Sequence, residues 1–291
     1  MRVLIIGPGY VGLELGRQLA GAGHVVFGLR RGGAAELAAA GMHPLRGDIT
    51  NPASLAGLPV RFDWVVNCVS STHGGADDYR RVYREGMRNV LNWLGGTPPG
   101  KFVYTSSTGV YGQNDGSLVD ESAPVEPPTE TGRVLAEAEA ELLTAARESG
   151  FPGVVLRVAG IYGPGRGWWF KQFLAGEARL EGDGGRWLNM IHRDDVAGAV
   201  AAALAQGRTG EIYNAVDDEP VRQRDFFAWL AAELGRPLPP SAPEDANTNH
   251  RRGLTSKRVS NGKLKRELGY GFRFPTFREG YAAELAAARR G

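Results

Sequence analysis

Short runs of consecutive apolar residues recur through the first two thirds of the chain, and segments with helical spacing separate them. The apolar runs are Val3–Ile6, Val25–Leu29, Trp64–Cys68, Phe102–Thr105 and Val154–Val158. Continuous rather than alternating runs are typical of parallel strands that helices cover on both faces. The helical patterns are Leu13–Ala22, Ala35–Ala40, Asp78–Leu94 and Arg133–Ser149. The alternation predicts an α/β fold with a doubly wound parallel sheet and right-handed crossovers.

The last third of the chain has a different pattern. Proline and glycine cluster at residues 163–167 and 237–243, and helical spacing returns at Phe226–Leu234 and Thr276–Arg289. We expect this part to form a smaller domain over the carboxyl edge of the sheet, where such folds bind ligands. The predicted sheet domain comprises residues 1–160 and 188–216, and the predicted smaller, substrate-binding domain comprises residues 161–187 and 217–291.

Charge and cysteine content narrow the class of protein. The 291 residues include 34 basic and 32 acidic side chains, and a net charge of +2 gives no broad field for nucleic acid or an anionic membrane. Cys68 is the only cysteine, which excludes an internal disulfide and favours a reducing, cytoplasmic location. The histidines are scattered, and Met1–Ile6 is too short for a targeting segment. We expect a soluble protein without a metal site that acts on a small molecule.

Gly7, Gly9 and Gly12 form a G-x-G-x-x-G turn directly after the first apolar run. In Rossmann-type sheets such a turn lets a pyrophosphate approach the backbone at the start of the next helix. We expect these glycines, with Tyr10 and Val11 between them, to bind a dinucleotide. The alternative is a turn that serves only packing.

The end of the second apolar run bears on the cofactor. It carries Arg30 and Arg31, and the next acidic residue is Glu36. A carboxylate here would hold the ribose 2′-OH of NAD, whereas guanidinium groups suit the 2′-phosphate of NADP. The sequence therefore favours NADP(H) over NAD(H), and the alternative is a pair of solvated arginines. Asp48, followed by Ile49, either accepts a hydrogen bond from the adenine or caps a helix.

Three further motifs lie at Val103–Gly112, which reads VYTSSTGVYG, and at Leu156–Gly165 and Met190–Val196. They resemble motifs of the extended short-chain dehydrogenase/reductase family, in its NAD-dependent epimerase/dehydratase branch. Tyr213–Asp218 and Lys257–Asn261 are similar to the same family, so the resemblance covers nearly the whole chain. It implies a Rossmann-type fold with a smaller C-terminal substrate-binding domain, and hydride transfer by an oxidoreductase or an epimerase/dehydratase.

The family's catalytic positions are only partly matched. Its members carry a Ser or Thr before the V-Y-G turn and a Tyr-x-x-x-Lys pair on the next long helix. Ser107 matches the first position, but Thr131 and Leu135 stand where the tyrosine and lysine belong, and Tyr83 stands at a family Asn. No alignment restores the pair, because residues 112–161 contain neither tyrosine nor lysine. The chain therefore resembles atypical members that keep the nucleotide fold and lose part of the catalytic set.

Other side chains could transfer the proton. His73 follows the fourth strand at the cofactor edge and could exchange protons near neutral pH, or it is a solvent-facing loop residue. Tyr162 either approaches the substrate or packs, and Glu130 is either a base or a helix-start carboxylate. His192, followed by Asp194, is interpreted as a helix cap.

A glycine-rich loop with Arg166 and Trp168 is the main candidate for substrate binding. In the family this region holds the diphosphate and base of a nucleotide sugar, and arginine and tryptophan suit phosphates and stacking. The predicted substrate-binding residues are Tyr162, Arg166, Trp168, Arg186 and Arg258, and Arg251 and Arg252 add charge nearby. The predicted ligand is a small polar, phosphorylated or nucleotide-sugar molecule, and the alternative is a solvated basic face.

These observations favour an NADP(H)-binding oxidoreductase in which Ser107 orients the reacting oxygen and His73 supplies the proton. A non-catalytic redox sensor or partner-binding protein explains the altered catalytic positions as well. A remnant that binds nothing conflicts with the intact glycine turn. Asp78–Leu94 and Arg133–Ser149 resemble the helices that pair in family dimers, which would allow a homodimer.

Overall fold

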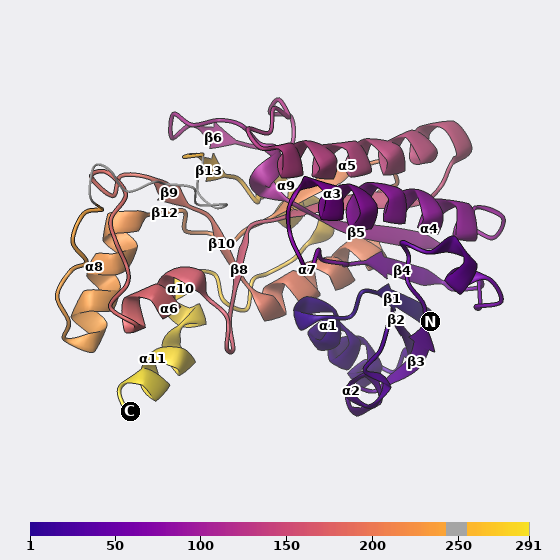
Figure 1. Ribbon diagram of the computed structural model, residues 1–291, viewed down its shortest axis with the longest axis horizontal. Coiled ribbons are helices and arrows are strands. Elements are labelled where there is room, and N and C mark those ends of the chain that lie inside the picture. Colours follow the sequence, from indigo (N-terminus) through magenta and orange to yellow (C-terminus); the bar gives the residue numbers. More distant parts are fainter. Residues whose placement is uncertain (243–254, 291) are drawn as a thin grey trace.

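The computed structural model describes residues 1–242 and 255–290. Its centre is a sheet of seven parallel strands in the order β11-β7-β5-β4-β1-β2-β3 (Figure 1). The strands are β1 (Arg2–Ile6), β2 (Val25–Arg30), β3 (Met42–Arg46), β4 (Trp64–Asn67), β5 (Lys101–Ser107), β7 (Gly153–Val158) and β11 (Ile212–Ala215). The strand order reverses between β1 and β4, and ligands of such sheets bind at that switch point. The predicted doubly wound α/β fold is confirmed.

Helices cover both faces of this sheet. They are α1 (Tyr10–Gly21), α2 (Ala34–Ala39), α3 (Ala76–Tyr79), the π-helical turn η2 (Arg80–Glu85), α4 (Gly86–Gly95), α5 (Glu130–Ser149) and α7 (Arg193–Gln206), with 3-10 turns η1 (Pro52–Leu55) and η3 (Thr108–Val110). The predicted helix at Asp78–Leu94 corresponds to the continuous run from α3 through η2 to α4. Within residues 1–242 and 255–290, no helix is long and apolar enough to cross a membrane.

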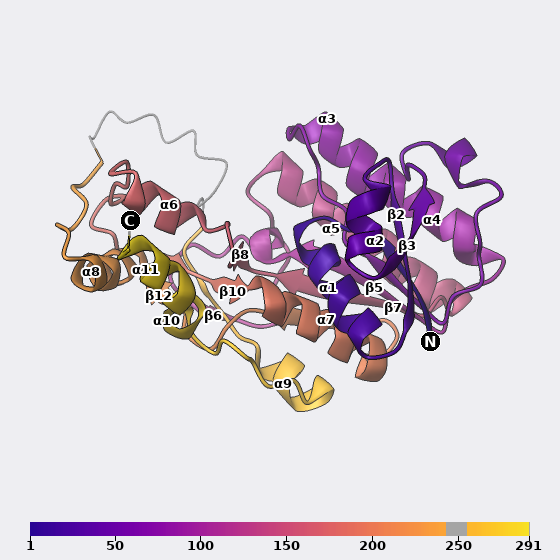
Figure 2. The same ribbon diagram turned by 90° about the horizontal axis from the view of Figure 1, so that it is seen from below.

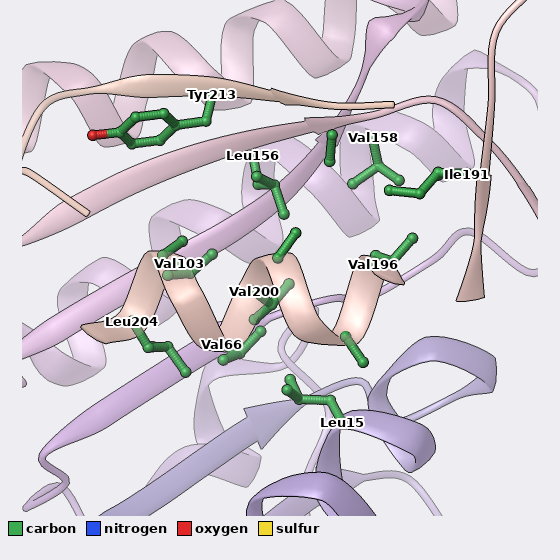
Figure 3. Close-up of a cluster of buried hydrophobic side chains, with 14 of the residues drawn as sticks. Leu15, Val66, Val103, Leu156, Val158, Ile191, Val196, Val200, Leu204 and Tyr213 are labelled. Carbon is green, nitrogen blue, oxygen red and sulfur yellow. The ribbon is translucent and has the colours of Figure 1, made fainter. Parts of the chain in front are cut away.

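The side chains of each strand alternate between two cores. Val3 and Ile5 of β1 face the core beneath α1 and α7, whereas Leu4 and Ile6 face the core beneath α4 and α5. Figure 3 shows the first core, where Leu15 of α1 and Val200 of α7 meet the sheet. Because both faces of the inner strands β1, β4, β5 and β7 are buried, their apolar runs in the sequence are continuous, whereas the edge strand β3 is largely exposed.

A smaller lobe lies beyond the carboxyl ends of the strands (Figure 2). It contains α6 (Trp168–Leu174), α8 (Gln223–Leu234), α10 (Phe277–Gly280), α11 (Ala282–Ala288) and the short paired strands β8 (Gly160–Tyr162), β10 (Met190–His192), β9 (Trp187–Leu188) and β12 (Val221–Arg222). Its core is aromatic: Phe170, Phe226 and Phe277 pack around Tyr281. Aromatic side chains bury a large area each, which suits a small core.

One segment of the predicted smaller domain returns to the sheet. β13 (Arg258–Val259) pairs with β6 (Leu118–Val119), and α9 (Gly262–Leu268) packs on α7 and β11. Residues 258–268 therefore join the larger lobe, although the sequence pattern assigned all of 217–291 to the smaller one. This return brings the residues just before β13 to the boundary between the lobes.

Candidate functional site

Two cavities open at the carboxyl edge of the sheet. The larger, which we call the cleft, has a volume of about 580 Å³ and lies between the lobes. The smaller, of about 360 Å³, lies over the ends of β1 and β2. Gly9, Val69 and Ser70 line both cavities. The two cavities therefore meet at the glycine turn, where sequence analysis expects a pyrophosphate.

The three positions of this turn require glycine for different structural reasons. Gly7 has φ +74°, and a Cβ there would lie 2.6 Å from the Cα of Val69. A Cβ on Gly12 would lie 2.9 Å from the Sγ of Cys68. Gly9 is different, because a Cβ there would meet no described residue beyond its two chain neighbours closer than the carbonyl oxygen of Gly7 at 3.9 Å. Packing requires Gly7 and Gly12, whereas the open space at Gly9 fits a ligand that approaches the backbone. Tyr10 and Val11 follow and line the cleft.

Arg30 and Arg31 both line the smaller cavity. Arg30 is held in place by hydrogen bonds to the carbonyl oxygens of Pro8, at 3.1 Å, and Gly32, and by an ion pair of 2.6 Å with Glu36. Arg31 is exposed, and its guanidinium donates a hydrogen bond of 3.4 Å to the hydroxyl of Thr72. The cavity thus has two guanidinium groups at its outer end, one of them paired with a carboxylate.

Asp48 and Ile49 also line the smaller cavity. One carboxylate oxygen of Asp48 accepts hydrogen bonds from the backbone N–H and the hydroxyl of Thr50, at 2.9 and 2.8 Å. These bonds fix the turn after β3 and explain the residue structurally. The second carboxylate oxygen is left for a donor such as an adenine amino group, so both interpretations of Asp48 remain compatible with the structure.

His73 lines the smaller cavity and does not line the cleft, so it does not share a cavity with Ser107. Asp78 determines this position: its carboxylate accepts hydrogen bonds from the Ser71 hydroxyl at 2.5 Å and from the His73 N–H at 3.2 Å. The side chain of His73 is exposed. These bonds and the adjacent Arg81 hold the pKa of Asp78 well below its ordinary value.

Ser107 ends β5 and lines the cleft, where its Oγ accepts a hydrogen bond of 3.1 Å from the N–H of Gly109. Leu135 lines the cleft from α5 and offers no polar group. Thr131 lies on the first turn of α5 outside the cleft lining, and its hydroxyl pairs with that of Thr129 at 3.2 Å. The wall next to Ser107 is therefore apolar at the position where the family has its lysine.

The remaining acid–base candidates make structural contacts. Glu130 forms an ion pair with Arg80. His192 is buried, and its Nδ1 accepts a hydrogen bond of 3.2 Å from the N–H of Asp194 at the start of α7. This contact makes His192 a helix cap, and burial lowers its pKa.

Tyr162 lines the cleft but is itself almost fully buried. Its ring stacks on Tyr281 at 4.4 Å, and its hydroxyl donates a hydrogen bond of 3.3 Å to the carbonyl of Thr276. Burial raises the pKa of Tyr162 far above its ordinary value. The ring therefore shapes the cleft, and the hydroxyl is strongly held in its neutral form.

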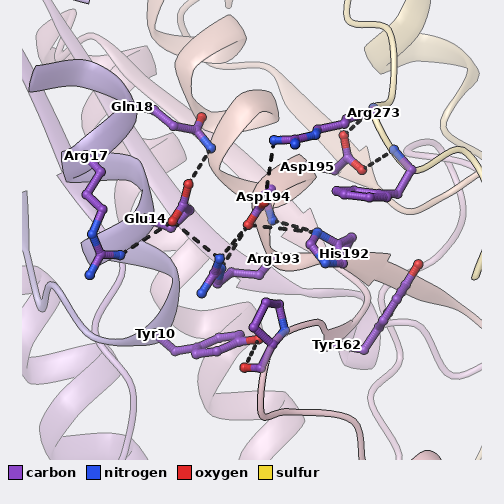
Figure 4. Close-up of polar contacts among 12 residues, drawn as sticks. Tyr10, Glu14, Arg17, Gln18, Tyr162, His192, Arg193, Asp194, Asp195 and Arg273 are labelled. Atoms are coloured by element: carbon purple, nitrogen blue, oxygen red, sulfur yellow. Dashed lines mark hydrogen bonds and ion pairs between the residues drawn. The ribbon is translucent and has the colours of Figure 1, made fainter. Parts of the chain in front are cut away.

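A polar cluster joins the glycine turn to the loop over the cleft (Figure 4). The Tyr10 hydroxyl donates to the carbonyl of Pro164 at 3.1 Å. The guanidinium groups of Arg166 and Arg193 lie 5.1 and 5.2 Å from the centre of the Tyr10 ring. Arg193 also pairs with Glu14 of α1 at 3.4 Å. One side chain of the cofactor turn therefore contacts both lobes.

The predicted substrate-binding residues fall into two groups. Arg166, Trp168 and Arg186 line the cleft with Tyr162, and Arg186 lies over the Trp169 ring at 5.3 Å. Arg258 does not line the cleft: it is exposed and donates to the carbonyl of Gly116 at 3.0 Å. Arg251 and Arg252 lie outside the described residues.

Lys257, immediately before β13, lines the cleft and was not among the predicted site residues. It is 5% exposed, and its Nζ donates to the carbonyl of Tyr111 at 2.9 Å and to the hydroxyl of Thr255 at 2.7 Å. Burial lowers the pKa of Lys257 to about 8. Strand alternation places Lys257 and Val259 on one face and Arg258 on the other, but only the fold shows that the face of Lys257 is the buried one, so no signal in the sequence singled out Lys257.

Tyr79 and Tyr83 line the cleft from the opposite side. Their ring centres are 4.8 Å apart, and the hydroxyl of Tyr83 accepts a hydrogen bond of 3.2 Å from the N–H of Ser71. Desolvation raises the pKa of Tyr83 to about 12. Across the described ranges, no three His, Cys, Asp or Glu side chains are arranged to hold a metal ion.

Comparisons with known proteins agree with this architecture. The model of the NAD dependent epimerase/dehydratase family matches residues 3–215. Protein YeeZ of Escherichia coli K12 is 28% identical over 284 residues, which cover 94% of this chain and 96% of that protein.

Two solved structures resemble the whole chain. A protein from Methylobacillus flagellatus, described as a putative NAD-dependent epimerase/dehydratase, is 34% identical with a TM-score of 0.78 over 99% of this chain and 98% of that one. DesIV, the dTDP-glucose 4,6-dehydratase of Streptomyces venezuelae, was solved with NAD bound and is 25% identical, with a TM-score of 0.84 over 100% and 98% of the chains.

Proposed function

The chain belongs to the NAD-dependent epimerase/dehydratase family, and we propose that it is an NADP(H)-dependent oxidoreductase acting at a carbonyl or secondary alcohol carbon. The observation that carries the proposal is the junction of the two cavities at Gly9. A dinucleotide with its pyrophosphate at that glycine has room for one half in each cavity. When bound, the nicotinamide would supply or accept a hydride in the cleft, beside Ser107.

Arg30 and Arg31 support the preference for NADP(H). Both line the cavity that would take the adenosine half, and an arginine fork matches the oxygens of a 2′-phosphate. Glu36 pairs with Arg30 and reduces its positive charge. Arg31 has no carboxylate partner among the described residues, so we expect it to make the larger contribution to phosphate binding.

Ser107 would orient the reacting oxygen of the substrate. Its Oγ already accepts a hydrogen bond from Gly109, so its own hydrogen is available for donation into the cleft. That donation would polarise a carbonyl and hold it in one position. A hydroxyl in this role does not need to ionise, which suits serine.

The walls of the cleft favour an anionic substrate with an aromatic or otherwise flat group. Arg166 and Arg186 line it with Trp168 and Trp169, and none of the described lining residues is Asp or Glu. Arg186 pairs with Glu181 at 2.6 Å, which reduces its positive charge, so we expect Arg166 to make the larger contribution to anion binding. Guanidinium groups bind carboxylates and phosphates, and indole rings stack on flat groups. A nucleotide sugar and an aryl keto acid both meet this description.

The test is calorimetry of the ligand-free protein with NADPH and NADH, followed by an assay of NADPH oxidation. The substrates are phenylglyoxylate and its uncharged ethyl ester, which differ only in the anionic group. We expect NADPH to bind at least tenfold more tightly than NADH, a difference of about 1.4 kcal/mol, and phenylglyoxylate to be preferred over the ester. Tight binding of NADPH without oxidation of it by any ketone would favour a redox sensor instead.

A further inference from the structure

We propose that Lys257 is a catalytic residue that gives the proton to the substrate oxygen during ketone reduction and removes it during alcohol oxidation. This inference rests on the proposed function and adds the acid–base group that Ser107 cannot supply. His73 lies in the other cavity, and Leu135 and Thr131 offer no group that exchanges protons near neutral pH.

The position of Lys257 follows from the turn after β5. Ser107 precedes the 3-10 turn η3, and Tyr111 follows it, with its N–H bonded to the carbonyl of Thr108 at 3.3 Å. The Lys257 ammonium donates to the carbonyl of Tyr111. The hydroxyl and the ammonium are thus anchored at the two ends of one short turn, and both line the cleft.

Hydrogen bonding leaves the ammonium of Lys257 one proton for a ligand. Of its three N–H groups, two are used by Tyr111 and Thr255, and no described residue accepts the third. Asn189 fixes the backbone, because its amide donates to the carbonyl of Lys257 at 2.9 Å and accepts from the N–H of Val259 at 2.8 Å. The amine is therefore held at a fixed place on the cleft wall.

The electrostatic surroundings let the amine exchange protons near neutral pH. The other titratable or charged side chains that line the cleft are Tyr10, Cys68, Tyr79, Tyr83, Tyr162, Arg166, Arg186 and Tyr281. No carboxylate of the described residues pairs with Lys257, so burial is uncompensated and lowers the pKa of Lys257 to about 8. A general acid is most effective when its pKa lies near the working pH.

In the reduction, the carbonyl carbon would take the hydride that a bound reduced nicotinamide supplies, and the π-electron pair of the C=O bond would move to oxygen. That oxygen takes a proton from the Lys257 ammonium, and an O–H bond forms as an N–H bond breaks. The neutral amine then recovers a proton from water. Thr255 lines the cleft and contacts Nζ, so its hydroxyl connects the amine with that water. Alcohol oxidation runs through the same atoms in reverse.

The kinetic test compares the wild-type protein with Lys257→Met, Lys257→Arg and the control Lys171→Met, an exposed lysine on α6. The reactions are NADPH-dependent reduction of phenylglyoxylate and NADP⁺-dependent oxidation of mandelate. We expect Lys257→Met to lower kcat by about 10²–10⁴-fold, with unchanged NADPH affinity and unchanged behaviour of the control. Lys257→Arg keeps the charge but has no proton to give near neutral pH, so it should restore KM and not kcat.

The pH profiles separate proton transfer from anion binding. Wild-type reduction should fall as the pH rises through about 8, and oxidation should rise over the same range, because they need the charged and the neutral amine respectively. Neither the fall in the reduction rate nor the rise in the oxidation rate near pH 8 should occur in Lys257→Met. A wild-type kcat and profile in that variant, or a kcat restored by Lys257→Arg, would overturn the proposal.

A second measurement is independent of turnover. The lysines of the wild-type protein and of Lys257→Met are reductively methylated with ¹³C-formaldehyde. The NMR signal that only the wild-type protein shows belongs to Lys257, and its shift is followed as the pH is changed. We expect a midpoint near 8, well below the ordinary lysine value of 10.5. An ordinary lysine midpoint for this signal refutes the proposal. Failure of Lys257 to become methylated in the wild-type protein also refutes it, because a proton donor must be reachable from the cleft. If the wild-type protein binds NADPH and reduces neither ketone, the proposed function fails for aryl ketones, and this titration still decides the role of Lys257.

Discussion

The hydroxyl of Tyr10 donates a hydrogen bond to the backbone carbonyl of Pro164, 3.1 Å away, so a residue of the glycine turn holds the loop above the cleft. The loop depends on glycine: Gly163, Gly165 and Gly167 have φ values of +133°, +69° and +154°. Backbone hydrogen bonds of 2.9 and 2.8 Å between Gly163 and Arg166 close this loop on itself, and the Tyr10 hydroxyl ties it to the glycine turn. The position of the loop and that of the glycine turn are therefore physically linked.

Tyr10→Phe should weaken substrate binding without weakening cofactor binding. The variant removes one neutral hydrogen bond, worth about 0.5–1.5 kcal/mol, and keeps the ring between Arg166 and Arg193. We expect the KM for phenylglyoxylate to rise about three- to tenfold. Calorimetry with NADPH provides the comparison: an equal loss of cofactor affinity would mean that Tyr10 acts on the cofactor rather than on the loop.

Alanine at Gly9 and at Gly7 should separate ligand binding from packing. Gly9→Ala places a methyl group in open space beside the expected pyrophosphate, so NADPH affinity should fall at least tenfold while the urea midpoint stays close to wild type. Gly7→Ala forces φ +74° on a residue with a Cβ and presses on Val69, which should cost about 1–3 kcal/mol of stability. If Gly9→Ala instead lowered the urea midpoint and left NADPH affinity unchanged, both expectations for that variant would be contradicted.

Substitutions of Arg31 and Glu36, at the smaller cavity, should change the preference for NADPH over NADH in opposite directions. Arg31→Ala should weaken NADPH binding by about 1.5–3 kcal/mol, the range for hydrogen bonds to charged groups, and leave NADH binding unchanged. Glu36→Gln removes the carboxylate that pairs with Arg30, so NADPH should bind more tightly relative to NADH. Parallel titrations with both cofactors provide the check. Equal losses for NADPH and NADH in Arg31→Ala would show that Arg31 contributes no phosphate specificity.

Lys257→Met should make the protein more stable at neutral pH. Folding buries the amine and lowers the pKa of Lys257 from 10.5 to about 8, which corresponds to a cost of about 3 kcal/mol at most for the charged form. Between these pH values the unfolded chain binds more protons than the folded one, so wild-type stability rises with pH. The advantage of the Met variant should be largest below pH 8 and shrink toward pH 10.5. Chemical unfolding at pH 7 and pH 10 measures it, with Lys171→Met as the control.

The sheet and the glycine turn could be predicted because local pattern determines them. Strands such as β1 are apolar on both faces, and Gly7, Gly9 and Gly12 follow at the spacing that a phosphate turn requires. The start of the helix α7 was predicted from the His192 cap, but its length was not, because the helix is alanine-rich and buried around most of its circumference, so it lacks a polar face. Helices of that kind give little periodic signal.

The cleft was harder to predict because long-range contacts assemble it. Lys257 and Arg258 are adjacent and equally basic, and only the pairing of β13 with β6 decides which of them faces inward. Similarly, the hydrogen bonds of Asp78 direct the loop that carries His73 toward the smaller cavity. No spacing in the sequence encodes either arrangement.

The π-helical turn η2 makes the length of one helix critical. An i→i+5 turn takes up about one residue more than an i→i+4 turn, and this one lies between Tyr79, on the cleft wall, and Met87, which is anchored in the core beneath α4. Deleting one residue from Arg80–Glu85 would restore regular α-helix and rotate Tyr79 by about 100° relative to the anchored part. A single-codon deletion here would change which side chains form one wall of the cleft and leave the core intact. Substrate preference could therefore change during evolution through the gain or loss of this one turn.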